Sequence, residues 1–417
     1  MGIQLEIVKL DAKRRYTTGD NVHGVVRVRL SRSMEISDVT ISLKGSVRTF
    51  LIEKGPAFIL GNDVPKVAEE HHKLFTTSKV LFPHDNIQPS STPKGVVLHR
   101  GEYTIPFELS FPATSTCSSS QPGFKHVETV LPPSFEGQAT DHGAEARVEY
   151  VVRAEVNRPG RLKKGASTHQ NLRFSPPDPS PHSLPFSNSG WCTGRGPLHA
   201  GLSPVISTFS SGTPSRELPI LLLEARVPYP PILYPGGPLP LHLSIQSLPT
   251  HMQLVPTTRI RALSINLYGS TFAKAGIHHA SWKSTTELFH LDSLSRLVNC
   301  GQYMEELSDL NRTILDDTTL PELTTSFTTC TVEQTYTLEV EAWFSVGKND
   351  ALKSVKISIN VELWSGNNTE NGITGASPSH QDAHEHARSV ISLRPGLLAH
   401  LAGGAGDRDD RGPPPYR

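Results

Sequence analysis

The residues best suited to a specific contact are four consecutive ones, Pro413-Pro414-Pro415-Tyr416, which form a Pro-Pro-x-Tyr motif followed only by Arg417. Consecutive prolines hold a polyproline II helix without help from a fold, so this segment loses little conformational entropy on binding. A WW-domain groove clamps such a pair of prolines between aromatic side chains and takes the tyrosine ring in a second pocket. We therefore predict that Pro413, Pro414 and Tyr416 bind a WW domain.

Two histidine-rich stretches have spacings that metal ligands use. On a helix, His380, His384 and His386 would present ligands at positions i and i+4. Their polar, proline-bearing surroundings favour a solvated tail instead. The second stretch, Glu69-Glu70-His71-His72, falls in a segment that we predict to be a loop and receives the same interpretation. The sequence therefore predicts no metal site and no cofactor.

The sequence also gives no sign of a catalytic centre. It contains no nucleophile elbow, no phosphate-cradling loop and no His-Glu-x-x-His helix. Its four cysteines, at positions 117, 192, 300 and 330, form no Cys-x-x-Cys pair, which favours scattered reduced thiols of a cytoplasmic protein. We expect a protein that is not an enzyme.

Charge and hydropathy restrict the partners further. The formal net charge is +0, so no global field draws the chain to nucleic acid. The first residues lack the basic start and apolar core of a signal peptide, and no apolar run approaches the ~18 residues of a membrane span. We therefore expect a soluble, cytoplasmic protein that does not bind nucleic acid.

An alternating pattern of apolar residues occurs twice, from Tyr16 to Ser46 and again from Tyr234 to Ser270. Apolar residues at every second position lie on one face of a strand, while their polar neighbours face water. Because the repeated unit is far longer than a solenoid repeat, it indicates a duplicated β domain.

The first β block spans residues 1–174 and has its clearest alternation at 103–111 and 148–156. Half-buried strands of a β-sandwich need this pattern. Pro106 cannot donate a ladder hydrogen bond, so its strand is predicted to be an edge strand or to carry a bulge. The polar segments predicted to be long loops are residues 54–72 and 83–100.

Ser, Pro and Gly dominate residues 175–215, and we interpret this segment as an interdomain linker. The second β block follows at residues 216–365, where Leu307, Leu310 and Ile314 could line one face of a short helix. The composition of residues 366–417 predicts a disordered tail that carries the proline motif.

These strands resemble those of arrestins. Residues 16–25 are similar to the early strand pair of the arrestin amino-terminal domain, and residues 101–112 resemble its Gly-x-Tyr-x-Phe-Pro-Phe strand. Residues 131–135 and 148–154 match the next turn and strand, and residues 230–236 resemble the opening of the carboxy-terminal arrestin domain. The resemblance is to the α-arrestins, in particular the arrestin-related trafficking adaptors of fungi.

This resemblance implies two tandem immunoglobulin-like (arrestin-type) β-sandwich domains and no catalysis. It implies an adaptor that links a WW-domain HECT ubiquitin ligase to the cytoplasmic tails of plasma-membrane transporters or receptors, for ubiquitin-dependent endocytosis. The protein would then associate peripherally with the plasma membrane and endosomes through its cargo. Lys163 and Lys164 would be exposed acceptors of ubiquitin. The phosphate-sensing charged cluster of visual and β-arrestins has no match residue by residue.

Two alternatives remain open from the sequence. One is a retromer-like or other endosomal sorting scaffold that recruits no ligase and whose terminal prolines are incidental. The other is a β-sandwich glycosidase or lectin, which would need paired carboxylates that converge on a cleft. The sequence gives no reason to choose such a pair.

Overall fold

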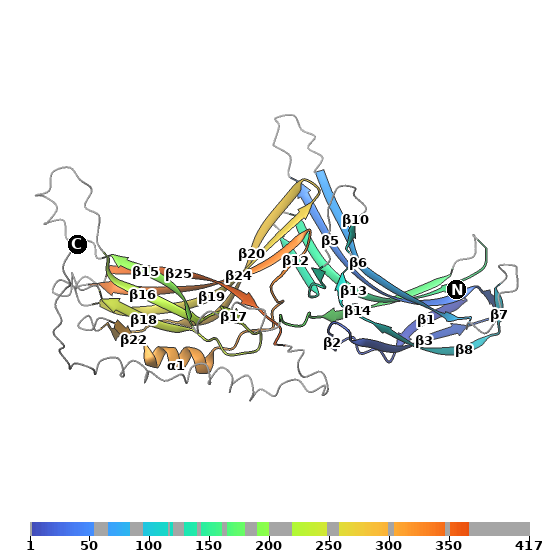
Figure 1. Ribbon diagram of the computed structural model, residues 1–417, viewed down its shortest axis with the longest axis horizontal. Coiled ribbons are helices and arrows are strands. Elements are labelled where there is room, and N and C mark those ends of the chain that lie inside the picture. The colour runs from blue at the N-terminus through green and yellow to red at the C-terminus, as the bar shows by residue number, and fades with distance from the viewer. Residues whose placement is uncertain are drawn as a thin grey trace, which may run out of the picture. The chain divides into compact units, whose positions relative to one another are not determined.

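A computed structural model describes residues 2–53, 66–83, 95–115, 117–119, 129–139, 143–160, 165–179, 190–199, 219–247, 258–298, 304–346 and 351–366. Within these ranges the chain is almost entirely β-strand and has one α-helix (Figure 1). The predicted all-β sandwich fold is confirmed. The predicted disordered tail lies outside the described residues, except for Gly366.

The amino-terminal sandwich packs a three-stranded sheet, β1-β3-β8, against a seven-stranded sheet ordered β10-β6-β5-β13-β14-β2, in which β12 also pairs with β13. Two short pairs, β4 with β7 and β9 with β11, complete it. The strands are β1 (Ile3–Val8), β2 (Arg15–Tyr16), β3 (Asn21–Leu30), β4 (Met34–Ile36), β5 (Asp38–Glu53), β6 (Lys66–Phe82), β7 (Val96–Leu98), β8 (Gly101–Ser110), β9 (Thr114–Ser115), β10 (Ser118–Ser119), β11 (Thr129–Val130), β12 (Phe135–Ala139), β13 (Ala144–Asn157) and β14 (Ala166–Phe174).

The carboxy-terminal sandwich packs a four-stranded sheet, β15-β16-β18-β22, against a seven-stranded sheet ordered β17-β25-β24-β19-β20. In the larger sheet β21 also pairs with β19, and β23 with β24. Its elements are β15 (Trp191–His199), β16 (Pro219–Pro228), β17 (Ile232–Leu233), β18 (His242–Ser247), β19 (Thr258–Ala275), β20 (His278–Leu291), β21 (Arg296–Leu297), β22 (Met304–Glu306), α1 (Ser308–Asp317), β23 (Phe327–Thr328), β24 (Val332–Val346) and β25 (Ala351–Leu363).

The two sandwiches repeat one topology, as the duplicated sequence pattern predicts. The order β6-β5-β13-β14-β2 of the first large sheet corresponds strand for strand to β20-β19-β24-β25-β17 of the second. Both sheets end in the same way, because two residues of β2 pair in parallel with β14 and two residues of β17 pair in parallel with β25. All the other strand pairings among the described residues are antiparallel, so this shared exception is a strong sign of duplication.

The predicted alternation is visible in the burial of the central strands. In β13 every second side chain from Ala144 to Val156 is buried, while most of the intervening polar residues are only partly covered. Pro106 lies in β8, which is the outer strand of its sheet, so the expectation of an edge strand is confirmed.

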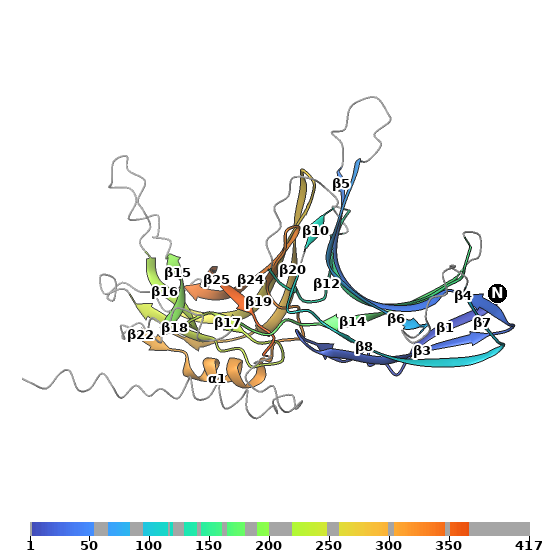
Figure 2. The same ribbon diagram turned by 45° about the vertical axis from the view of Figure 1, so that its right-hand side comes forward.

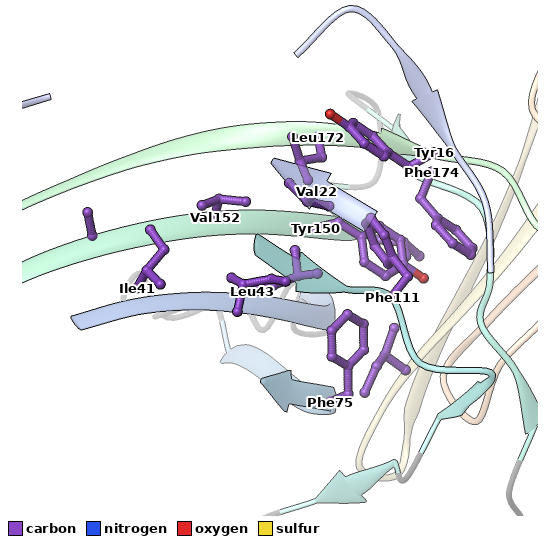
Figure 3. Close-up of a cluster of buried hydrophobic side chains, with 14 of the residues drawn as sticks. Tyr16, Val22, Ile41, Leu43, Phe75, Phe111, Tyr150, Val152, Leu172 and Phe174 are labelled. Atoms are coloured by element: carbon purple, nitrogen blue, oxygen red, sulfur yellow. The ribbon is translucent and has the colours of Figure 1, made fainter. Parts of the chain in front are cut away.

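An aromatic cluster fills the end of the amino-terminal core that lies near β2 and β14 (Figure 3). Phe111 lies at its centre, with ring centroids 4.9 Å from Phe174, 5.6 Å from Tyr150, 5.8 Å from Tyr16 and 6.0 Å from Phe75. Tilted and edge-to-face pairs of this kind add to the free energy gained from burial.

The carboxy-terminal core is mostly aliphatic, and helix α1 contributes to it. Leu307, Leu310 and Ile314 are buried against the sandwich, which confirms the helix that their spacing predicts. Leu307 is the residue just before the helix, and its carbonyl accepts a hydrogen bond from the Asn311 N–H at 2.8 Å. The Asn311 amide in turn bonds both backbone groups of Leu243 in β18, which fixes the helix on the sheet.

The long loops predicted at 54–72 and 83–100 are partly wrong. Residues 66–72 belong to β6, which pairs with β5 over almost its whole length, and residues 96–98 form β7. Polar residues dominate the start of β6, and its buried positions are occupied by Glu70 and His72 instead of apolar side chains. The pattern of apolar residues therefore does not indicate β6 as a strand.

Residues 191–199 also differ from the prediction, because they form β15 inside the segment that the sequence predicts as linker. This strand lies directly on β25, and a Cβ at Gly194 would clash with the side chain of Ile357. Glycine is therefore required for the close approach, and it also removes the apolar alternation that would have indicated a strand.

Candidate functional site

The residues that the sequence predicts to be functional lie outside the described part of the chain. Pro413, Pro414 and Tyr416 fall in 367–417, and Lys163 and Lys164 fall in 161–164. Their assigned roles therefore stay predictions. The histidines at 380, 384 and 386 lie outside the described residues as well.

The structure brings Glu70 and His72 together with two cysteines that no sequence pattern links to them. The interpretation of residues 69–72 as a solvated loop is wrong, because these residues lie in β6 and the Glu70 and His72 side chains are buried. We call His72, Cys117 and Cys330, together with Glu70, the junction cluster. Glu70 and His72 come from β6 of the amino-terminal sandwich, and Cys117 immediately precedes β10, which pairs with β6 at His72 and Lys73. Cys330 comes from the turn between β23 and β24 of the carboxy-terminal sandwich. Figure 2 labels β10, the short strand that Cys117 precedes.

The three possible ligand atoms of the junction cluster converge. The Cys330 Sγ lies 3.1 Å from His72 Nδ1, the Cys117 Sγ lies 3.4 Å from the same nitrogen, and the two sulfur atoms are 3.5 Å apart. The His72 side chain is completely buried, Cys117 is half-buried and Cys330 is exposed. The cluster thus has a buried imidazole at its base and a thiol at the surface.

Glu70 fixes the orientation of the imidazole. One of its oxygens, Oε1, lies 2.6 Å from His72 Nε2, and the other, Oε2, accepts a hydrogen bond from the Gly276 N–H at 2.7 Å. The Glu70 side chain is only 2% exposed, so its charge needs these partners. Because Gly276 lies in the β19–β20 turn, this carboxylate also connects the two sandwiches.

The hydrogen bonds of the cluster shift its pKa values. Burial works against protonation of His72, but the hydrogen bonds with Cys330 and Glu70 prevail, and the pKa of the imidazole is raised. The hydrogen bond from Cys330 lowers the pKa of the Cys117 thiol. The same hydrogen bond, together with burial, raises the pKa of Cys330 to about 12. Cys117 is therefore the first of the two thiols to ionise.

Apolar packing also joins the two sandwiches. Ala273, Ala275 and Val332 of the carboxy-terminal sandwich are buried in the core of the amino-terminal one. The Thr49 hydroxyl donates to the Lys274 carbonyl at 2.8 Å, which fixes the β19 end against β5. These contacts, like the bond between Glu70 and Gly276, link the end of β19 to the amino-terminal sandwich.

Lys13-Arg14-Arg15 form a short basic run. In the structure Arg14 is paired with Asp20 at 3.2 Å, and Arg15 reaches Glu322 of the carboxy-terminal sandwich at 2.7 Å. All four side chains remain partly or largely exposed, so these pairs contribute little to stability. They neutralise two of the three cations within the chain itself.

Sequence reasoning missed the junction cluster for two reasons. Glu70 and His72 are two positions apart, so they lie on one face of a strand, but this signal has meaning only once the segment is recognised as strand. The two cysteines are 213 residues apart, and no local pattern joins them.

A comparison with known protein families gives a match in the first half of the chain. The family described as Arrestin (or S-antigen), N-terminal domain, matches residues 6–172. The match covers nearly all of β1 to β14.

Residues 6–172 are therefore similar to the arrestin amino-terminal domain.

The match to residues 6–172 supports the arrestin resemblance drawn from residues 16–25, 101–112, 131–135 and 148–154. Arrestin-family proteins are generally adaptors without catalytic activity. The likeness of the second sandwich to a carboxy-terminal arrestin domain was drawn from residues 230–236 and stays a prediction. A search of curated proteins found no match to the chain. Among the described residues, no helix combines the length and apolar composition needed to cross a bilayer.

Proposed function

We propose that this protein is a non-catalytic α-arrestin adaptor that links a WW-domain HECT ubiquitin ligase to plasma-membrane transporters or receptors. One observation carries the proposal: the chain that contains the arrestin domain at 6–172 also contains Pro413-Pro414-Pro415-Tyr416. The arrestin domain supports a role as a trafficking adaptor. The proline motif adds the ligase, because tandem prolines followed by tyrosine have the shape that a WW groove accepts.

The proposed mechanism is an increase in effective concentration. About 50 residues separate the end of β25 at Leu363 from Pro413. If these residues are disordered, as their composition predicts, their root-mean-square span is about 40 Å. A ligase held on such a tether samples a small volume around the bound cargo, which makes ubiquitin transfer local. No covalent step by this chain is required.

The proposed partners follow from the same scheme. The sandwich surface would bind the cytoplasmic tail of the cargo, and Lys163 and Lys164 would accept ubiquitin beside β13 and β14. The protein would be cytoplasmic and would reach the plasma membrane and endosomes through its cargo. The rival function is a sorting scaffold that recruits no ligase, for which residues 413–416 would be dispensable.

The test replaces the ring that the WW pocket would hold. With a purified array of WW domains, Tyr416→Ala should weaken binding of the full chain by about tenfold or more, because burying an aromatic side chain is worth about 2 kcal/mol. Pro415→Ala is the matched control, since it changes the variable position and preserves Pro-Pro-x-Tyr. Equal binding by the wild type and Tyr416→Ala would refute the assignment of the motif.

A second measurement separates the adaptor from the sorting scaffold. Truncation after Asp410 removes the motif and leaves every described residue in place. Ubiquitination of the cargo in cells should fall for the truncated chain if the protein is a ligase adaptor. Unchanged ubiquitination together with unchanged delivery of cargo would support the scaffold instead.

A further inference from the structure

We propose that His72, Cys117 and Cys330 bind a zinc ion that joins the amino-terminal and carboxy-terminal sandwiches. The proposal is independent of the ligase-adaptor function. It rests on the position of three ligand atoms, on the chemistry of those atoms and on the carboxylate behind the histidine.

The spacing of the ligand atoms is close to that of a tetrahedral zinc site. With Zn–S near 2.3 Å and Zn–N near 2.0 Å, an ideal tetrahedron has edges of about 3.8 Å between sulfurs and about 3.5 Å from nitrogen to sulfur. The observed distances are 3.5 Å between Cys117 Sγ and Cys330 Sγ, and 3.4 and 3.1 Å from these sulfurs to His72 Nδ1. Outward shifts of a few tenths of an ångström would therefore admit the ion.

The chemistry of the three donor atoms favours zinc over calcium and magnesium. Two thiolates and one imidazole are borderline-soft ligands that favour zinc, whereas calcium and magnesium require oxygen. Two thiolates would also neutralise the charge of a divalent ion in a partly buried site. Three protein ligands leave the fourth position of the tetrahedron for water, and the exposed Cys330 lies on the side from which water can reach it.

The carboxylate of Glu70 orients the histidine ligand. Histidines that bind metal through one ring nitrogen usually donate the other N–H to a carboxylate, which fixes the tautomer and aims the ligand atom. Here Glu70 Oε1 lies 2.6 Å from His72 Nε2, while Nδ1 faces the two sulfurs. Glu70 is itself held by the Gly276 N–H, so the ring cannot turn away without losing its hydrogen bond to a fixed carboxylate.

A disulfide between Cys117 and Cys330 is the rival use of the same thiols. Its sulfurs would have to approach from 3.5 Å to about 2.05 Å, and it would leave His72 and Glu70 without a role. A zinc ion uses all three donors and the carboxylate. The ion would also connect positions 213 and 258 residues apart, which gives it a large effect on the association of the two sandwiches.

The test is cobalt substitution of the full-length, reduced chain. Zinc is removed with a chelator, Co²⁺ is added, and the visible spectrum is recorded. We expect one Co²⁺ per chain, with thiolate-to-metal charge transfer and the intense d–d bands of tetrahedral coordination, all lost when Zn²⁺ is added. Elemental analysis of the protein as purified should find one zinc per chain.

Matched variants locate the site. Cys117→Ser and Cys330→Ser should each abolish the tetrahedral cobalt spectrum. Glu70→Gln should retain it with about 10–100-fold weaker affinity, since it alters only the support of the ligand. Cys192→Ser is the control, because Cys192 lies in β15 outside the cluster and should leave the spectrum unchanged.

Three results would overturn the proposal. One is a cobalt complex without sulfur charge transfer, which would place the metal on histidines such as those at 380, 384 and 386. Another is a Cys117–Cys330 disulfide in non-reducing peptide maps, together with no bound zinc. The third is a charge-transfer band that persists in both serine variants. The wild-type spectrum by itself reports sulfur ligation, so the test holds even if a variant fails to fold.

Discussion

The two sandwiches share a backbone frame down to single residues. Gly45 pairs with Tyr150 in the first, and Gly269 pairs with Tyr336 in the second. A Cβ on Gly45 would stand 2.9 Å from a ring carbon of Tyr150, and a Cβ on Gly269 would stand 3.1 Å from one of Tyr336. In each sandwich a glycine on one strand makes space for a tyrosine ring on its neighbour.

The two tyrosines also use their hydroxyl groups in the same way. Tyr150 donates to the Pro132 carbonyl at 2.6 Å, and Tyr336 donates to the Thr324 carbonyl at 2.7 Å. Each bond ties a central strand to the connection that enters the large sheet. The second hydroxyl is less buried than the first.

The side chains that fill the core differ between the two sandwiches. The amino-terminal sandwich surrounds Tyr150 with Phe75, Phe111 and Phe174, whereas the carboxy-terminal sandwich has aliphatic neighbours and uses Leu310 and Ile314 of helix α1 as part of its core. Strand order and the glycine–tyrosine pair therefore define the frame, while different side chains can supply the buried volume.

The largest expected effect comes from removing the central ring of the aromatic cluster. Phe111→Ala should lower the free energy of unfolding by about 3–5 kcal/mol, because four rings pack around Phe111 and cannot all collapse into the cavity. Denaturant unfolding followed by circular dichroism would measure the loss. Phe344→Ala is the matched change in the aliphatic core and should cost less. Equal losses would show that the difference in filling has no energetic consequence.

A smaller effect should separate the two tyrosine hydroxyls. Tyr150→Phe leaves the Pro132 carbonyl buried without its donor and should cost about 1–3 kcal/mol of unfolding free energy. Tyr336→Phe should cost less, since water can reach the less buried Thr324 carbonyl. The same denaturation measurement on the two single variants makes the comparison. A larger loss for Tyr336→Phe would contradict the assigned difference in burial.

The smallest effect concerns acid stability and a buried carboxylate of the carboxy-terminal sandwich. The Glu224 side chain is 3% exposed and pairs with Arg226 and with Arg195. Burial opposes its ionisation, but the hydrogen bonds from the two arginines prevail and lower its pKa below the ordinary 4.5. Its contribution to stability is therefore complete above about pH 4.5 and is lost as the pH falls through the lowered pKa.

We expect Glu224→Gln to remove this part of the acid dependence of thermal unfolding. Glu102 of the amino-terminal sandwich is the control, since arginine also lowers its pKa but its side chain is 44% exposed and screened by water. Glu102→Gln should leave the acid dependence nearly unchanged. A similar change in both variants would mean that burial of Glu224 is unimportant.

Much of this fold could be predicted from alternation. The strands around Val148–Val156 and Tyr336–Phe344 and the helix at Leu307–Ile314 were found because apolar residues recur at the period of one buried face. β6 and β15 escaped prediction because Glu70 and His72, and the glycine at 194, occupy positions where the pattern expects apolar side chains.

The two candidate sites differ in whether the sequence alone can reveal them. The proline motif can be recognised from sequence because its four residues are adjacent and need no fold to acquire their shape. The junction cluster could not be recognised, because its residues come from positions 70, 72, 117 and 330 and meet only when two sandwiches pack together.

Local sequence patterns are enough to predict the fold class, the duplication and the proline motif, since each depends on residues that are near one another along the chain. The convergence of a buried carboxylate, an imidazole and two thiols follows from tertiary packing alone. The reason is physical: strand pairing and domain contact place atoms according to the register of distant segments, and no local pattern records that register.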